Sequence, residues 1–406
     1  MGNIKQLGLL SLLLLAACGG DGNGPSVINA GGPGDRSAVA PTRSGDNSGA
    51  AVGTSSASSP ETTPAPAATS APAATPSAAA GTTVQVDGQD CYTLQPGFSA
   101  SAGGSSAVSL YPAPGAAYVS HYRVLDNPKS AGMCLANYRR ALVGLPALAS
   151  RAPLATAAQN HSDYMLWSGA PSHDEIAGKT GYTGATPNDR IQALYPTNMS
   201  GEVLAFSGIT TSQARAPLAL SSNDALVAQL IDAPFHRMGL LGNFQSAGSG
   251  FASQVQPTSS GGTTASFYQV IDMADELKIG TDTQLLAYPY AGQSGVPASW
   301  ADYESPDPAP GYYGKTLGYP ISLQALKTGA TLDVTSFTLV DAANADVPCL
   351  LAARSTASLP QQTRTELQSS AICTPLAPLK AGTRYTVSVK GNYGANPFAL
   401  SWSFST

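Results

Sequence analysis

The chain has 406 residues, which is more than one ordinary domain needs and enough for two buried cores with tails. It holds 20 Lys and Arg against 25 Asp and Glu, so it has no excess of cations that would capture a polyanion. We therefore exclude nucleic acid as a partner. Only 11% of the residues are charged, so a place where imidazoles and carboxylates gather is a candidate site.

The first 18 residues have the pattern of a bacterial export signal. Lys5 supplies the positive start, and residues 9–17 form an apolar run that is too short to span a bilayer permanently. The run ends in LAAC at residues 15–18, which resembles the lipobox of bacterial lipoproteins. This resemblance implies that Cys18 is lipidated and anchors the protein to a membrane. We expect a protein of the bacterial cell envelope, on the outer membrane where the organism has two.

Residues 19–81 are a predicted disordered tether. They consist of Gly, Ser, Ala, Thr and Pro with almost no large apolar side chain, so they cannot bury enough surface to offset the entropy of ordering. A flexible coil of this length has a mean span on the order of 45 Å. It would hold the folded part away from the lipid surface. An O-glycosylated stalk is the alternative, because Ser, Thr and Pro are mixed.

The four cysteines that remain form two sequence-local pairs. We predict disulfides between Cys91 and Cys134 and between Cys349 and Cys373, as is typical of an oxidising compartment. Neither pair has the two-residue spacing of a zinc knuckle or a redox motif. Closing these loops stabilises the fold by roughly 3–4 kcal/mol each in the chain-entropy model.

Residues 82–284 are predicted to form an α+β domain. Residues 82–125 read as a short lead-in with strand-like alternation. Apolar spacing and capping residues predict four helices, at residues 132–148, 153–169, 186–196 and 222–232. A Ser-Gly-Gly turn between two alternating runs predicts a hairpin of strands at residues 247–256 and 264–273.

The remaining residues divide into a connector at 285–320 and an all-β region at 321–406. The connector is rich in Pro, Tyr and Gly, and its aromatic residues either line a ligand groove or pack the two domains together. The region after it alternates apolar and polar residues between turn signals, which predicts an antiparallel β-sandwich. Its LKAGTRYTVSVKGNY segment, residues 379–393, resembles bacterial Ig-like domains, which usually serve as spacers or adhesive units.

Three of the four histidines lie in short motifs between residues 134 and 275. The motifs are an N..R...GL..L opening at 137–148, A..HS..M at 158–165, Ser-His at 172–173, TP.DR at 186–190, Gly-Glu at 201–202 and P-x-H-R at 234–237. In order and spacing they resemble the CAP superfamily, which comprises cysteine-rich secretory proteins, antigen 5 and pathogenesis-related 1 proteins. The resemblance covers roughly residues 132–275.

This resemblance implies an α-β-α sandwich with an open cleft, lined by two histidines and acidic residues that in some members hold a divalent metal. Carried over by position, His173, Glu202 and His236 are cleft residues, and His161 is the histidine of the second helix. The family's second carboxylate has no clear match, and Asp232 is the nearest candidate.

Two residues depart from the family pattern. The Asn that usually follows Gly-Glu is Val203, which removes a side chain that would fix the turn expected there. The residue before the second cleft histidine is Phe235 where the family has Gly.

Two imidazoles and one carboxylate are a ligand set for a divalent metal with an open position. His173, Glu202 and His236 supply this set, for zinc or magnesium, and such a metal could activate water. The alternative is a polar cluster that satisfies its own buried groups by hydrogen bonds. His161 is interpreted as a supporting or core histidine. The chain lacks the Gly-x-Ser-x-Gly and His-Glu-x-x-His patterns, so no catalytic residue is assigned.

The sequence favours a binding module over an enzyme. In this interpretation the cleft of a lipid-anchored envelope protein binds an envelope or extracellular ligand, a lipid, a peptide or a glycan, with or without a divalent metal. A metal-assisted hydrolase of envelope or extracellular substrates is the alternative. A non-catalytic adhesin or spacer with a vestigial cleft is the third, and it accounts for Val203 and Phe235.

Overall fold

The computed structural model describes residues 27–30, 81–98 and 107–406. The predicted signal peptide with Cys18, and all of the predicted tether except residues 27–30 and 81, lie outside these ranges. Residues 81–406 belong to one compact unit. In the part of the chain that the structure describes, no helix has the length and apolar character that crossing a membrane requires.

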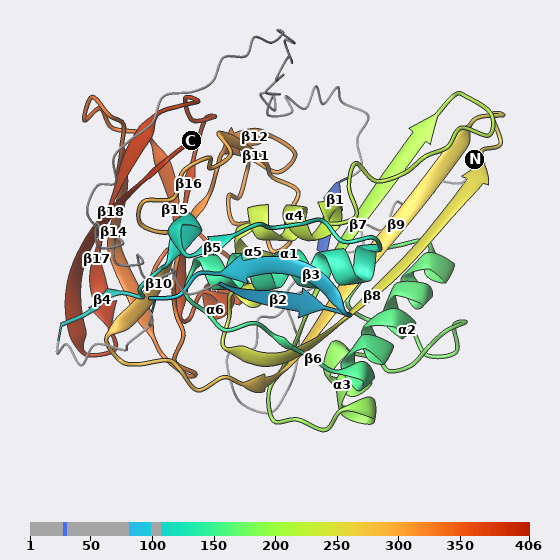
Figure 1. Ribbon diagram of the computed structural model, residues 1–406. Coiled ribbons are helices and arrows are strands. Elements are labelled where there is room, and N and C mark those ends of the chain that lie inside the picture. Colours follow the sequence, from blue (N-terminus) through green and yellow to red (C-terminus); the bar gives the residue numbers. More distant parts are fainter. Residues whose placement is uncertain (1–26, 31–80, 99–106) are drawn as a thin grey trace, which may run out of the picture. The chain divides into compact units, whose positions relative to one another are not determined.

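A five-stranded sheet forms the centre of the first half of this unit, in the order β1-β7-β9-β8-β6. Its strands are β1 (Val27–Ala30), β6 (Ala149–Ser150), β7 (Ser200–Thr211), β8 (Phe244–Pro257) and β9 (Thr263–Glu276). Strand β9 pairs antiparallel with both long neighbours, β7 and β8 (Figure 1). The predicted hairpin is therefore confirmed, and each of its strands is longer than the alternation alone predicted.

Helices cover both faces of this sheet. They are α1 (Pro128–Leu142), α2 (Ala152–Ser168), α3 (Pro187–Leu194) and α4 (Ala225–Asp232). Successive side chains of a strand point to opposite faces. Ile271 of β9 accordingly packs in the same apolar cluster as α1 and α4, whereas Val270 packs with α2. The α+β class predicted for this region is confirmed.

Two glycines of β8 let helix α2 approach the sheet closely. A Cβ atom on Gly248 would lie 2.0 Å from the backbone nitrogen of Ala155, and one on Gly250 would lie 2.2 Å from the backbone of Ala158. No side chain larger than hydrogen fits at these positions without moving the helix. The close packing fixes α2, and with it His161, against the sheet (Figure 1).

Local signals at the helix ends agree with the structure. The Thr186 hydroxyl accepts from the backbone of Asp189, whose carboxylate accepts from the Thr186 N–H, so α3 begins with a capping box and Pro187. Helix α2 ends at Gly169, which has the left-handed conformation. The prediction of a turn at Gly201 and Glu202 is wrong. Both residues lie in strand β7, where they are paired with Met273 and Asp272 of β9.

The second half of the unit is mostly β-structure, as predicted, with one short helix, α6 (Gln361–Glu366). A five-stranded sheet has the order β15-β16-β13-β10-β4, a three-stranded sheet has the order β14-β17-β18, and β11 and β12 form a pair. Their bounds are β4 Ser109–Leu110, β10 Gln284–Tyr288, β11 Ser299–Ala301, β12 Thr316–Gly318, β13 Ile321–Ala325, β14 Leu332–Val340, β15 Cys349–Ala353, β16 Ser370–Pro375, β17 Arg384–Tyr393 and β18 Asn396–Ser405.

The segment predicted as a connector takes part in this β-structure. Strand β10 pairs antiparallel with β13 and parallel with β4, which comes from the predicted lead-in. Residues 285–320 therefore contribute to the packed core rather than forming a loose linker. The Ig-like assignment and the domain boundaries stay predictions.

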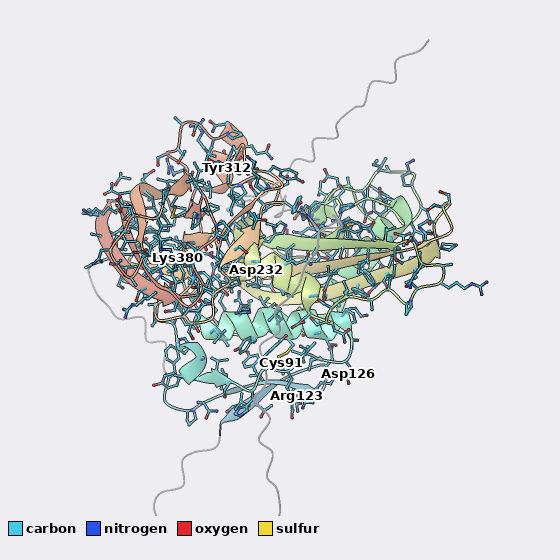
Figure 2. All side chains as sticks on the ribbon, turned by 90° about the horizontal axis from the view of Figure 1, so that it is seen from above. Cys91, Arg123, Asp126, Asp232, Tyr312 and Lys380 are labelled. Carbon is cyan, nitrogen blue, oxygen red and sulfur yellow. A yellow bond between two sulfur atoms is a disulfide. The ribbon has the colours of Figure 1, made fainter. Side chains whose placement is uncertain are left out.

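Both predicted disulfides are present. Cys91, on β3 (Gln89–Leu94), is bonded to Cys134 of α1, and Cys349 is bonded to Cys373 between the paired strands β15 and β16. Strand β3 pairs with β2 (Thr82–Val86) to form a hairpin, and β3 also pairs with β5 (Val119–Ser120). The first disulfide holds this hairpin against α1 (Figure 2). The lead-in is thereby a fixed part of the fold.

Candidate functional site

The four residues predicted for the cleft come from four different elements and are all buried. His161 lies on α2, His173 on the loop that follows it, Glu202 on β7 and His236 on α5 (Pro234–Leu240). The exposed fraction is 5% for His173 and 0% for the other three. Glu202 Oε1 lies 2.6 Å from Nδ1 of His173 and 3.8 Å from Nε2 of His161. The structure thus brings His161, His173 and Glu202 together.

Glu202 is held by two cationic or donor groups, one on each oxygen. Its Oε1 contacts His173 Nδ1 at 2.6 Å, and its Oε2 accepts from Arg190 Nη2 at 2.7 Å. Burial alone would raise the pKa of Glu202, but the Arg190 guanidinium and the nearby imidazoles hold it well below its usual range. Glu202 is therefore ionised and acts only as an acceptor.

This contact fixes the tautomer of His173. An ionised carboxylate cannot donate, so Nδ1 of His173 carries the proton and donates it to Glu202. Burial lowers the pKa of His173 although Glu202 opposes the shift, so the ring is neutral. Its Nε2 then has a lone pair, and this buried atom has no hydrogen-bond partner.

His236 has a similar arrangement, with a carboxyl group that the sequence did not predict. Burial raises the pKa of this group, Glu304, to about 8, so it is mostly protonated at pH 7. Nδ1 of His236 lies 2.8 Å from Glu304 Oε1, and the same oxygen accepts the backbone N–H of His236 at 3.0 Å. Oε1 therefore serves as the acceptor and Nδ1 as the donor. Burial lowers the pKa of His236 to about 3, so this ring is neutral as well. Its buried Nε2 also lacks a partner.

Glu304 lies between β11 and β12, outside the region that resembles the CAP superfamily. The candidate for the second carboxylate, Asp232, accepts from the hydroxyl of Tyr319 at 3.0 Å, whereas the carboxyl group in contact with His236 belongs to Glu304. No motif around Glu304 marks it. Its 1% exposure, which is unusual for a glutamate, becomes visible only in the folded chain.

His161 has a supporting role. Its Nδ1 lies 2.9 Å from Glu175 Oε1, and its Nε2 lies 2.7 Å from the carbonyl oxygen of Ser172. Both ring nitrogens thus face acceptors, which leaves neither for a ligand. Glu175 also accepts from the backbone N–H of Thr183 at 2.6 Å. Together these contacts fix the loop that carries His173.

Asp272 adds a further buried carboxyl behind Glu202. The two residues are directly opposite on β9 and β7, and Asp272 is fully buried. Burial, together with the charge of Glu202, raises the pKa of Asp272 well above its usual value. Protonation of Asp272 is therefore favoured, which reduces the negative charge beside Glu202.

The arrangement presents two neutral imidazoles, each with an unpartnered Nε2. The ionised Glu202 orients His173 through Nδ1, and the carboxyl group of Glu304 orients His236 in the same way. Carboxylates hold metal-binding histidines in this way. Glu202, which was predicted as a third ligand, has both oxygens engaged by His173 and Arg190. Within residues 81–98 and 107–406, no three side chains among His, Cys, Asp and Glu gather in a geometry that could hold a metal ion. The metal site stays a prediction.

The buried ion pair between Glu202 and Arg190 gives a stability prediction. Glu202→Gln removes the closer anionic partner of the buried Arg190 guanidinium and leaves only Glu175, whose Oε1 lies 3.7 Å from Arg190 Nε. We therefore expect the free energy of unfolding to fall by roughly 3 kcal/mol in urea titrations. Asp282→Asn is the control, because it breaks an exposed pair with Lys327 and should cost less than about 1 kcal/mol. Equal effects of the two substitutions would contradict the structural role of Glu202.

Three comparisons with known proteins bear on this site. The model of the cysteine-rich secretory protein (CAP) family matches residues 134–256. A crystal structure of an extracellular protein containing a SCP domain from Bacillus anthracis str. Ames is 24% identical over 34% of this chain and 39% of that chain, with a TM-score of 0.23. A search of curated proteins found no significant match. The family match includes His161, His173, Glu202 and His236 but ends before Glu304. This chain therefore contains a CAP domain.

Proposed function

We propose that the chain is a binding module in which His173 and His236 hold a divalent transition metal. The observation that carries this proposal is the pair of buried Nε2 atoms that have no hydrogen-bond partner. Leaving a buried polar atom unpaired costs free energy, and buried groups in folded proteins are rarely left so. One metal ion held between the two imidazoles would account for both atoms.

The donor set favours zinc over magnesium. Imidazole nitrogen suits zinc and similar metals, whereas magnesium prefers oxygen ligands. Both rings are neutral because burial lowers their pKa values, so neither needs to lose a proton before it binds a metal at pH 7. A zinc ion held in this way would act as a Lewis acid toward a donor atom of the ligand or water. Glu202 and Glu304 keep each Nε2 aimed at the site.

Burial favours binding over hydrolysis. His173 is 5% exposed and His236 is fully buried, so the scissile bond of an envelope polymer could not reach their Nε2 atoms without a rearrangement of the residues that cover them. A small donor group of a lipid, a peptide or a glycan could complete the coordination. The hydrolase alternative requires an open approach, which this arrangement does not favour.

We also propose that a lipid on Cys18 anchors this module to the bacterial envelope. The support is the LAAC sequence at residues 15–18 after an apolar run. The two disulfides fit an oxidising compartment on the outer side of a membrane.

Zinc titration by calorimetry tests the metal site. We expect the full chain to bind one zinc ion, His173→Ala and His236→Ala to abolish this binding, and Glu304→Ala to weaken it about 10–100-fold because the His236 ring loses the acceptor on Nδ1. His121→Ala is the matched control, since this histidine is exposed, lies outside the matched region and shares a hydrogen bond with Ser120 through Nδ1. Wild-type affinity in both histidine variants would contradict the metal site and leave a binding or spacer role without metal.

Detergent phase partition tests the anchor. The full chain, produced in a bacterium that processes lipoproteins, is expected to enter the detergent phase, and Cys18→Ser is expected to remain in the aqueous phase because it has no thiol to lipidate. Ser11→Ala in the apolar run serves as the control and should partition like the wild type. Identical partition of the Cys18 variant and the wild type would contradict the anchor.

A further inference from the structure

A cavity of about 110 Å³ is lined by neither His173 nor His236. Its walls come from the turn between α5 and β8, from the end of β13 and from α6 with the residues after it. Met238 and Phe244 form an apolar wall, and residues 327–329, of which Lys327 and Gly329 are exposed, also line the cavity. This volume is several times what one water molecule needs.

One polar residue of this cavity is Gln324, which is 5% exposed. Its Nε2 donates to the carbonyl oxygens of Met238 at 3.2 Å and Leu241 at 3.1 Å. Two acceptors on the nitrogen fix the orientation of the amide. The Oε1 atom, which is therefore an acceptor, is buried and has no partner.

Asn243 repeats this pattern. Its Nδ2 donates to Glu276 Oε1 at 3.3 Å and to Thr328 Oγ1 at 3.0 Å, which again fixes the amide. The Oδ1 atom is buried without a partner. Asn243 itself is 7% exposed, so water does not readily supply the missing donor.

Glu366, at the end of α6, is the third polar residue, and it is 4% exposed. Neither of its oxygens has a partner with hydrogen-bond geometry. Burial raises the pKa of Glu366 to about 8, the nearby Gln362 amide offsets part of the rise, and the charge of Glu304 adds to it. The other charged group on the wall, Lys327, pairs with Asp282 at 2.5 Å. The cavity wall therefore includes three buried side chains that carry oxygens without a partner of hydrogen-bond geometry, although the Glu366 carboxyl also interacts with Gln362. Above the Glu366 pKa of about 8 all of these oxygens are acceptors.

We propose that this cavity binds the primary ammonium group of a small organic ligand with a short apolar body. An ammonium group has three N–H donors and no acceptor, which suits a site with acceptors on Glu366, Gln324 and Asn243. The apolar body would contact Met238 and Phe244. A calcium ion would need six to eight oxygen ligands, which these apolar walls do not supply. The proposal is independent of the metal proposed for the two histidines.

Calorimetry or ligand-observed NMR with the full chain tests this proposal, with n-butylammonium as the probe at a pH above the Glu366 pKa of about 8. We expect saturable binding of n-butylammonium and none of n-butanol, which has the same apolar body without the charge. Glu366→Gln removes the carboxylate at nearly constant size and should weaken binding at least about tenfold. Asp346→Asn, an exposed carboxylate outside the cavity lining, should leave the affinity unchanged.

Ala325→Leu provides a second variant, because it places a larger side chain in the cavity wall and leaves the three polar residues unchanged in sequence. It should also weaken binding, while thermal melting followed by circular dichroism shows whether each variant is folded. Equal affinity of the wild type, Glu366→Gln and Ala325→Leu would overturn the site. Binding of calcium but not of n-butylammonium would overturn the ligand class, and absence of binding by the wild type would overturn the proposal as a whole.

Discussion

The contact between His236 and Glu304 is the interaction on which the proposed site depends. It joins residues 68 positions apart in the chain and links a helix of the CAP domain to a segment that follows it. The next residue, Arg237, strengthens the link, because its Nη2 donates to the carbonyl oxygen of Pro320 at 2.8 Å. Its guanidinium also lies over the rings of Tyr288 and Tyr319. Helix α5 is thereby fixed to the β-structure of the second half.

The two halves of the chain supply different side chains of the proposed site. The part that matches the family ends at residue 256, and it supplies both imidazoles and the carboxylate on His173. The carboxyl group on His236 comes from a segment more than forty residues further on, between two short strands that pair with each other. In the proposed function, the second half of the chain therefore completes the site and is more than a spacer.

Features that depend on local chemistry could be predicted from the sequence. The capping box of α3 needs only Thr186, Pro187 and Asp189, and the β8–β9 hairpin needs only a turn between two alternating runs. The disulfides could be predicted because the four cysteines form two pairs that are close in sequence, and we paired each cysteine with its neighbour in the chain. His173 and Glu202 could be placed together because the motif order of a known family carries that information.

Features that depend on tertiary contacts could not be predicted from the sequence. Glu304 has no neighbouring motif, and its role arises from a fold that carries it to His236. Glu202 was expected in a turn because a Gly-Glu pair often marks one, but three fully buried apolar residues after it continue β7 into the centre of the sheet. Likewise β10 was assigned to a connector because Pro and Tyr dominate the following residues. In the structure its residues are buried and its backbone pairs with β13.

The most direct test of this account is the tautomer of the two histidines, measured by long-range proton–nitrogen NMR on protein with nitrogen-15-labelled imidazoles. The account predicts that His173 and His236 are both neutral with the proton on Nδ1, and that zinc shifts only their Nε2 signals. Protons on Nε2, or Nε2 signals that do not respond to zinc, would contradict it, because the lone pairs that the proposed metal requires would then be absent.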